Sequence, residues 1–154
     1  MSAYDLVGRS VLVTGGAGGI GEATARLMVL RGARVMLADR VERVREVADA
    51  IAPGTGWVVA DVCTTDGAAA AVGAAVAYGG GLDVLVNGAG WDNPALFCDT
   101  SSTLWDQIIA VNFTSVLGCC QAGLPHLGAN RGAIVSIASD LARVGGWGEA
   151  VYAG

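Results

Sequence analysis

Two residues near the end of the sequence could act together on an alcohol or a ketone. Ser139 follows an apolar segment, and Tyr152 comes 13 positions later. A tyrosine phenol can exchange a proton with a substrate oxygen while hydride moves to or from a nicotinamide, and a serine hydroxyl can hydrogen-bond the same oxygen. Taken alone, the pair fits better as a strand-end hydroxyl and a packed aromatic ring. Its meaning depends on the binding site that the rest of the chain builds.

A glycine-rich turn near the start of the chain predicts such a site. Residues 11–13 are Val-Leu-Val, typical of a strand buried on both faces, and a helical pattern begins after residue 21. Glycine permits a tight turn and lets amides at a helix N-terminus approach a pyrophosphate. A helix-capping loop without a ligand is the alternative, but strand, turn and helix in this order favour a nucleotide. The turn residues are Gly15, Gly16, Gly18, Gly19, Ile20 and Gly21.

The second strand, expected at 34–38, is followed directly by Asp39. A carboxylate at that position can accept both hydroxyls of an adenosine ribose and repels a 2′-phosphate, so Asp39 favours NAD over NADP. Two alternatives stay open: Asp39 could cap the next helix, and the neighbouring Arg40 could tolerate a phosphate.

Two further strand ends carry candidate residues. Asp61 and Val62 follow a strand at 57–60, where Asp61 could either contact an adenine or cap the following helix. A strand at 83–86 is followed by a second glycine-containing turn, which in a parallel sheet would lie beside the first and frame one cleft with it. The residues of this second turn are Asn87, Gly88, Ala89 and Gly90.

Strands and helices alternate along the chain, which predicts an α/β fold with right-handed crossovers. We expect a Rossmann-type, doubly wound parallel sheet in the order 3-2-1-4-5. The fifth strand is expected at 132–138, and Ser101 and Ser102 are candidate caps for a helix. The expected helices after the first are at 41–51, 66–78, 100–111 and 114–127.

The composition excludes several classes of protein. The chain of 154 residues is 53% hydrophobic and 15% charged, as expected for one folded domain. Its net charge of −5 and lack of a basic cluster argue against nucleic-acid binding. No uninterrupted apolar run has membrane-spanning length, and residues 1–9 do not resemble a signal peptide, so we expect a cytoplasmic protein. The spacing of the cysteines does not match a metal site or a disulfide framework, so they are interpreted as small buried residues. They are Cys63, Cys98, Cys119 and Cys120.

Together these motifs resemble the short-chain dehydrogenases/reductases. The matching motifs are TGGAGGIG at 14–21, NGAG at 87–90, Asn112 in VNF, Ser139 and Tyr152. The resemblance covers essentially the whole chain and implies NAD(P)-binding and alcohol–ketone interconversion by hydride transfer. It implies a pyrophosphate contact for Gly15, Gly18 and Ile20, with the other turn glycines nearby. It also implies a ribose contact for Asp39, an adenine contact for Asp61 and Val62, and a nicotinamide-side position for Asn87.

The resemblance also assigns catalytic roles. Tyr152 would be the general acid/base, Ser139 would orient the substrate, and Asn112 would hold a proton-relay water or form a structural kink in its helix. Gly88 replaces a second asparagine that is usual in the family. The family pattern continues to a lysine four residues after the tyrosine, beyond Gly154, and all nine basic residues of this chain are arginines.

We therefore expect residues 1–154 to be the N-terminal portion of a single-domain enzyme, inactive and prone to aggregate when isolated. The parent would be a homodimer or homotetramer. Segments 89–97 and 136–154 resemble the branch that oxidises hydroxyacyl-CoA thioesters, including 2-hydroxycyclohexanecarboxyl-CoA dehydrogenases. That likeness would place Trp91, Leu96, Trp147 and Arg143 around the substrate; alternatively, the tryptophans fill loop cores. A 3-oxoacyl-acyl carrier protein reductase and a non-catalytic NAD-binding module are the rival interpretations.

Overall fold

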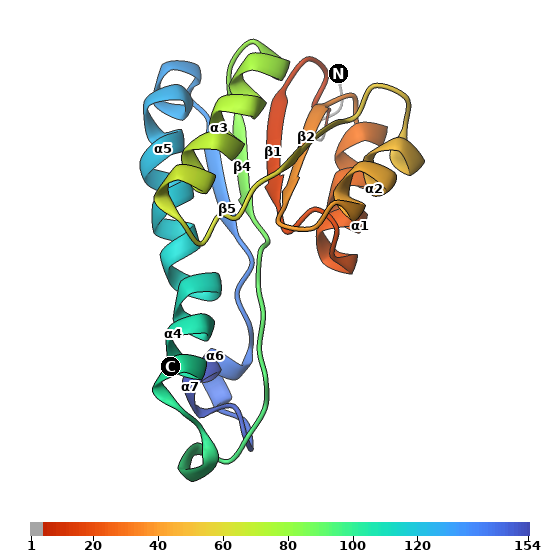
Figure 1. Cartoon of the computed structure of the whole chain (residues 1–154). Coiled ribbons are helices and arrows are strands. Elements are labelled where there is room, and N and C mark those ends of the chain that lie inside the picture. The colour runs from red at the N-terminus through yellow and green to blue at the C-terminus, as the bar shows by residue number, and fades with distance from the viewer. Residues whose placement is uncertain (1–4) are drawn as a thin grey trace.

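The computed structural model describes residues 5–154 and has one five-stranded sheet between two layers of helices (Figure 1). The strands lie in the order β3-β2-β1-β4-β5, and every neighbouring pair is parallel. This confirms the predicted α/β fold and strand order. The strand bounds are β1 Ser10–Thr14, β2 Arg34–Asp39, β3 Gly56–Val59, β4 Val84–Asn87 and β5 Ala133–Ser136.

Helices cover both faces of this sheet. α1 (Gly19–Leu30) and α2 (Arg43–Ile51) lie on one face, and α3 (Thr65–Gly79) and α5 (Ser115–Asn130) lie on the other (Figure 1). Two extended segments leave the carboxyl ends of β4 and β5 and run to a group of short elements beyond the sheet. These elements are η1 Phe97–Asp99, α4 Ser102–Ile109, η2 Ala110–Thr114, α6 Leu141–Val144 and α7 Ala150–Ala153.

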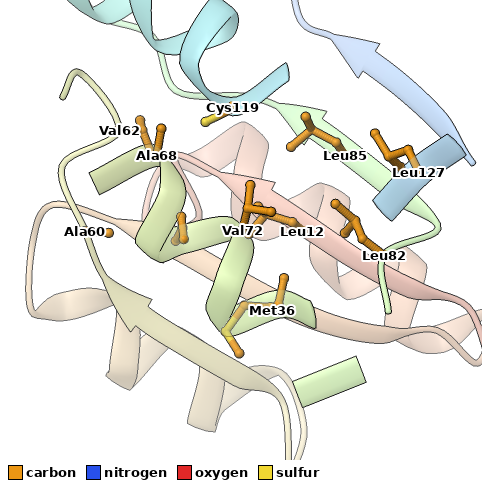
Figure 2. Close-up of a cluster of buried hydrophobic side chains, with 13 residues drawn as sticks. Leu12, Met36, Ala60, Val62, Ala68, Val72, Leu82, Leu85, Cys119 and Leu127 are labelled. Atoms are coloured by element: carbon orange, nitrogen blue, oxygen red, sulfur yellow. The ribbon is translucent and has the colours of Figure 1, made fainter. Parts of the chain in front are cut away.

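The side chains of β1 alternate between two hydrophobic cores. Leu12 packs with Val72 and Leu85 in the cluster under α3 and α5, which Figure 2 shows, whereas Val11 and Val13 pack on the α1 and α2 side. All five residues of β1 are buried, as expected for a strand covered on both faces. The core therefore fixes the carboxyl end of β1, from which the glycine-rich turn departs.

The two helices expected at 100–111 and 114–127 form one continuous helical run. α4 passes into η2, a π-helical turn, and then into α5. The expected break was wrong, because a π turn inserts a residue without ending the helix. Of the two candidate caps, Ser101 is the N-cap: its side chain accepts a hydrogen bond from the Leu104 amide at 3.3 Å.

The run Ser102–Asn130 is long and apolar enough, by length and composition alone, to cross a membrane. Its α5 part packs against α3 and β4, with Cys119 and Leu127 buried, which is the placement of a core helix in a layered fold. The outer side of the run leaves large apolar side chains exposed, at Ile109, Phe113, Leu117 and Leu124.

Asp83 connects the amino ends of β1 and β4. Its carboxylate accepts hydrogen bonds from the Ser10 amide and the Arg9 guanidinium, both at 2.8 Å. Burial alone would raise the pKa of Asp83, but these two donors and the charges of Arg9 and Arg34 lower it below its ordinary value. The folded state therefore favours the ionised carboxylate.

The four cysteines are free thiols in different surroundings. Cys119 is buried, Cys63 and Cys120 are half-buried, and Cys98 is exposed. The interpretation of the cysteines as buried small residues is therefore wrong for Cys98, which lies in the exposed turn η1.

Candidate active site

A cavity of about 110 Å³ lies where the carboxyl ends of the central strands meet. Parallel strands present the loops that follow them at one edge of the sheet, and this is where open α/β sheets bind ligands. The cavity brings together six of the residues predicted to bind the coenzyme: Gly15, Asp39, Asp61, Val62, Ala89 and Gly90. Arg40, Cys63 and Trp91 also line it.

The glycine-rich turn is built around Gly15 and Gly21. Gly15 has a φ of 68°, and a Cβ there would lie 2.7 Å from the carbonyl oxygen of Gly88 in the second turn. A Cβ on Gly21 would collide with the carbonyl oxygen of Gly15. Both positions therefore require glycine, because the two turns and the start of α1 are in direct backbone contact.

The amino end of α1 is open toward solvent. Gly18 is its N-cap and makes no side-chain bond, a Cβ on Gly19 would meet no atom within 4 Å, and the Ile20 side chain is 63% exposed. The first amides of a helix lack intrahelical partners and carry the positive end of the helix dipole. This terminus can therefore accept an anion such as a pyrophosphate.

Asp39 is held by the backbone at the end of β2. Its Oδ2 accepts a hydrogen bond from the Ala17 amide at 3.0 Å, and its Oδ1 accepts one from the Val41 amide at 3.3 Å. The N-cap of α2 is Glu42, so Asp39 does not cap that helix. Asp39 is half-buried and lines the cavity, and its contact with a ribose stays a prediction.

Asp61 lies beside Asp39 at the same edge of the sheet: the amide of Ala60 donates to the Asp39 carbonyl at 2.8 Å, and Asp39 and Asp61 both line the cavity. The Oδ1 of Asp61 accepts a hydrogen bond from the Cys63 amide at 3.0 Å, and Thr64 rather than Asp61 is the N-cap of α3. Of the two open interpretations of Asp61, helix capping is therefore excluded. Burial, then the hydrogen bond and charge of Asp61, raise the pKa of the adjacent Cys63 thiol to about 11.

Thr14 joins the two turns and was missed by the sequence analysis. Its hydroxyl oxygen accepts hydrogen bonds from the amides of Gly88 and Ala89, at 3.1 and 3.2 Å, and its side chain is fully enclosed. The hydroxyl donates to the Val86 carbonyl at 3.4 Å. The sequence feature that could have identified Thr14 is its position between a buried strand and a glycine turn.

Asn87 lies below the cavity rather than in its lining. Its Nδ2 donates to Ser136 Oγ at 3.2 Å and lies 3.6 Å from Cys120 Sγ, which ties β4 to β5. Its Oδ1 is enclosed and has no hydrogen-bond partner within residues 5–154. The predicted position near a nicotinamide stays a prediction.

Asn112 lies in η2 and binds the segment after β4. Its Oδ1 accepts a hydrogen bond from the Trp91 amide at 3.1 Å, and its Nδ2 donates to the carbonyls of Trp91 at 2.6 Å and Ile108 at 2.9 Å. The side chain therefore joins the π turn η2 to the segment after β4, and the kink interpretation stays a prediction. The role in holding a relay water stays a prediction.

Ser139 and Tyr152 lie beyond the carboxyl end of β5. Ser139 Oγ accepts a hydrogen bond from the Leu141 amide at 3.2 Å at the start of α6, and Tyr152 in α7 lines a small second cavity with Leu104 and Ile108. In the part of the chain that the structure describes, no hydrogen bond joins the two side chains. Their joint action on one substrate stays a prediction.

The second cavity differs from the predicted substrate pocket. Leu96, Arg143 and Trp147 do not line it, and Trp147 is 86% exposed. The exposure of Trp147 shows that it does not fill a loop core, so that interpretation is wrong for this residue. The positions of these residues around a substrate stay a prediction. Two carboxyl groups do line the cavity, and a hydrogen bond with Asp92, then burial, raise the pKa of Glu149.

Comparison with known proteins agrees with this geometry. Residues 9–154 match the family model described as short chain dehydrogenase. The chain is 40% identical over 142 residues to cis-4-hydroxycyclohexanecarboxylate dehydrogenase of Sinomonas cyclohexanicum, covering 89% of this chain and 57% of that protein. It is also 40% identical over 136 residues to 3-alpha-(or 20-beta)-hydroxysteroid dehydrogenase of Mycobacterium tuberculosis, covering 87% and 52%.

A solved structure gives the same result for the fold. The short chain dehydrogenase from Mycobacterium smegmatis has a TM-score of 0.91 and 38% identity, over 99% of this chain and 67% of that one. The chain thus spans little more than half the length of the two curated relatives. Its sheet order, its glycine turn and these matches have one explanation: the chain belongs to the short-chain dehydrogenase family.

Proposed function

We propose that this chain forms the coenzyme-binding part of an NAD-dependent oxidoreductase that interconverts a secondary alcohol and a ketone. One observation carries the proposal: Gly15, Asp39 and Asp61 converge on a single cavity beside the open amino end of α1. When bound, NAD supplies the hydride acceptor or, in its reduced form, the hydride donor. The chain's own residues bind the coenzyme, orient the substrate and move the proton.

The residues present fit a dinucleotide. Backbone crowding around Gly15 leaves the turn free of side chains, and the exposed start of α1 would hold the pyrophosphate. Asp39 would accept the ribose hydroxyls, and Asp61 with Val62 would border the adenine. The negative charge of Asp39 favours binding of NAD, whereas Arg40, which lines the same cavity, would favour binding of NADP.

Proton transfer would fall to Tyr152, with Ser139 orienting the substrate oxygen. An ionised phenol is the form that can accept a proton from an alcohol. A neighbouring ammonium group would favour the ionised form, but this chain contains no lysine. We therefore expect the 154-residue chain to bind NAD and to turn substrate over negligibly.

The substrate we propose is a secondary alcohol on an aliphatic ring, carried as a hydroxyacyl-CoA thioester. Two of the relatives bear names of ring-alcohol dehydrogenases, a hydroxycyclohexanecarboxylate and a hydroxysteroid enzyme. A 3-oxoacyl-acyl carrier protein reductase is the rival within the same chemistry. The exposed apolar side of α4 and α5 supports self-association of the parent protein.

Calorimetric titration with NAD⁺ and NADP⁺ tests the coenzyme proposal. NAD⁺ should bind about tenfold or more tightly than NADP⁺, and Asp39→Ser should remove most of this preference. Arg40→Ser is the matched control from the neighbouring position and should leave NAD⁺ binding nearly unchanged. Tighter binding of NADP⁺ would overturn the choice of NAD, and binding of neither dinucleotide would overturn the proposal.

A second assay addresses the substrate and the chemistry. NADH formation is followed with cyclohexanol, 4-hydroxycyclohexanecarboxylate and 2-hydroxycyclohexanecarboxyl-CoA, using Tyr152→Phe as the control. Turnover by the 154-residue chain that disappears in Tyr152→Phe would contradict the expectation that a lysine is needed. NAD⁺ binding without turnover agrees with it.

Two observations favour a second candidate, a non-catalytic NAD-binding module. The sequence has no lysine, and Ser139 already receives a hydrogen bond from its own loop. The two candidates differ in the parent protein: a module would bind NAD⁺ and yet give no NADH with any secondary alcohol.

A further inference from the structure

Ala17 lies in the middle of the glycine-rich turn and is held from two sides. Its amide donates to Asp39 Oδ2 at 3.0 Å, and its carbonyl oxygen accepts a hydrogen bond from the Arg43 guanidinium at 2.6 Å. Ala17 is 3% exposed. The two peptide groups that flank this one buried residue are therefore tied to β2 and to α2.

Within residues 5–154, the rest of the turn is held by hydrogen bonds between backbone groups. The Gly16 amide donates to the Ala38 carbonyl at 3.1 Å, and the Gly18 amide donates to the Gly15 carbonyl at 3.0 Å. Glycine populates a wide range of backbone angles, so a turn rich in glycine is not rigid by itself. A side chain that holds the carbonyl of Ala17 limits the directions in which the following amides can point.

Arg43 reaches this carbonyl from the first turn of α2, near a carboxylate on α1. Its guanidinium lies 4.0 Å from Glu22 Oε2, while Glu22 Oε1 accepts a 2.7 Å bond from Arg26. The Glu22 amide in turn donates to the Gly18 carbonyl at 2.8 Å. Arg43 thus connects α2 to both the turn and the start of α1.

The neighbouring arginines are placed differently. Arg40 lines the cavity, and the Arg45 guanidinium lies 5.6 Å from the centre of the Trp57 ring on β3. Arg45 therefore has the same charge as Arg43 and lies on the same helix, but it contacts a strand instead of the turn. It is a matched control for any effect that depends on charge or on α2 alone.

We infer that Arg43 is a positioning residue for the dinucleotide: it holds the Ala17 carbonyl and thereby aims the amides at the start of α1 toward the pyrophosphate. The inference rests on the proposed NAD function of the same site. Arg43 does not line the cavity that would hold the adenosine end of the dinucleotide, so it acts through the turn. Its effect should therefore appear only with ligands that carry phosphates.

The test is a titration of the wild-type chain and its variants with adenosine, ADP and NAD⁺. Arg43→Met should weaken ADP and NAD⁺ binding about tenfold, the effect of losing one charge-assisted hydrogen bond, and leave adenosine within about twofold. Arg43→Lys keeps a donor and should recover most of the loss. Arg45→Met should bind all three ligands like the wild type.

Salt separates positioning from simple attraction between charges. Through-space attraction by an exposed guanidinium is screened at high ionic strength, whereas a hydrogen bond that shapes the turn is retained. The difference between wild type and Arg43→Met should therefore persist at about 1 M salt, where the screening length is about 3 Å. A difference that disappears in salt would overturn the inference.

The remaining outcomes are also decisive. Equal loss of adenosine and ADP binding would indicate damage to the whole fold and overturn the inference, as would unchanged ADP binding. If Arg43→Met is unfolded at the assay temperature, Arg43→Gln replaces it and is judged by the same ratio of ADP to adenosine affinity. Failure of the wild type to bind any of the ligands would instead overturn the proposed NAD function.

Discussion

Replacing Thr14 with valine should destabilise the fold and loosen the second turn. The Thr14 side chain is 2% exposed, and its oxygen accepts the amides of Gly88 and Ala89. Valine has nearly the same shape, so the substitution removes the hydroxyl and leaves two amides without their acceptor. An orphaned buried donor costs about 1–3 kcal/mol, and partial access of water to these two puts the total at about 2–4 kcal/mol.

The loss is measured by urea unfolding at low protein concentration, followed by circular dichroism. Thr14→Ser keeps the acceptor and loses only a methyl group, so it should cost about 1 kcal/mol. Thr55→Val is the matched control: the Thr55 hydroxyl donates to the Ala52 carbonyl, which also accepts the Thr55 amide and so keeps a partner. Its cost should stay near 0.5 kcal/mol, by the usual scale of about ±0.5 kcal/mol for changes that orphan no group.

The outcome that refutes the reasoning is a Thr14→Val chain no less stable than Thr55→Val. That result would mean that water replaces the hydroxyl at both amides. A second readout is NAD⁺ affinity, which should fall in Thr14→Val and stay unchanged in Thr55→Val, because only Thr14 joins the two turns.

Three further predictions follow from single contacts. Gly21→Ala should abolish NAD⁺ binding in a titration, whereas Gly19→Ala, which meets open space, should retain it. Iodoacetamide at pH 8 should label Cys98 before Cys63, because a thiol with a pKa of about 11 is only about 10⁻³ ionised there; mass spectrometry showing Cys63 first would contradict this. Because the pKa of Asp83 is lowered in the folded state, its carboxylate stabilises the fold above about pH 4, and this stabilisation is lost as the pH falls through the folded pKa. The melting temperature of Asp83→Asn should therefore fall less steeply toward acid pH than that of the wild type. Parallel pH profiles of the two proteins would refute this prediction.

The fold could be predicted because its signals are local. Each strand is a short, largely apolar run, and β1 and β2 begin and end within a residue or so of the prediction. The join at η2 was not predicted, because a π turn inserts a residue and shifts the apolar spacing, so that one helix resembles two in the sequence. Similarly, Thr64 is the N-cap of α3 because its hydroxyl accepts a hydrogen bond from the Gly67 amide. The distance between these two groups cannot be known from the sequence.

The coenzyme side of the site was predictable for a related reason. Gly15, Asp39 and Asp61 each lie at the carboxyl end of a strand or within two residues of it, so a parallel sheet brings them together at one edge. Thr14 and Arg43 act through backbone amides and carbonyls, and the sequence shows at most the position of such a residue beside a turn, not the groups that it bonds. The surroundings of Tyr152 are set by loops, whose positions depend on distant contacts that the sequence does not show.

The two halves of the site differ in what holds them in place. The coenzyme half rests on β1, whose residues are all buried, and on the hydroxyl of Thr14. The catalytic half follows β5, whose residues are all exposed, and Tyr152 lies in α7, a helix of four residues. Helices this short are not stable alone, so α7 takes its position from surrounding contacts. Under the proposed function, dinucleotide binding and proton transfer would therefore depend on separate contacts: the first on the buried centre of the sheet, and the second on the contacts around β5 and α7.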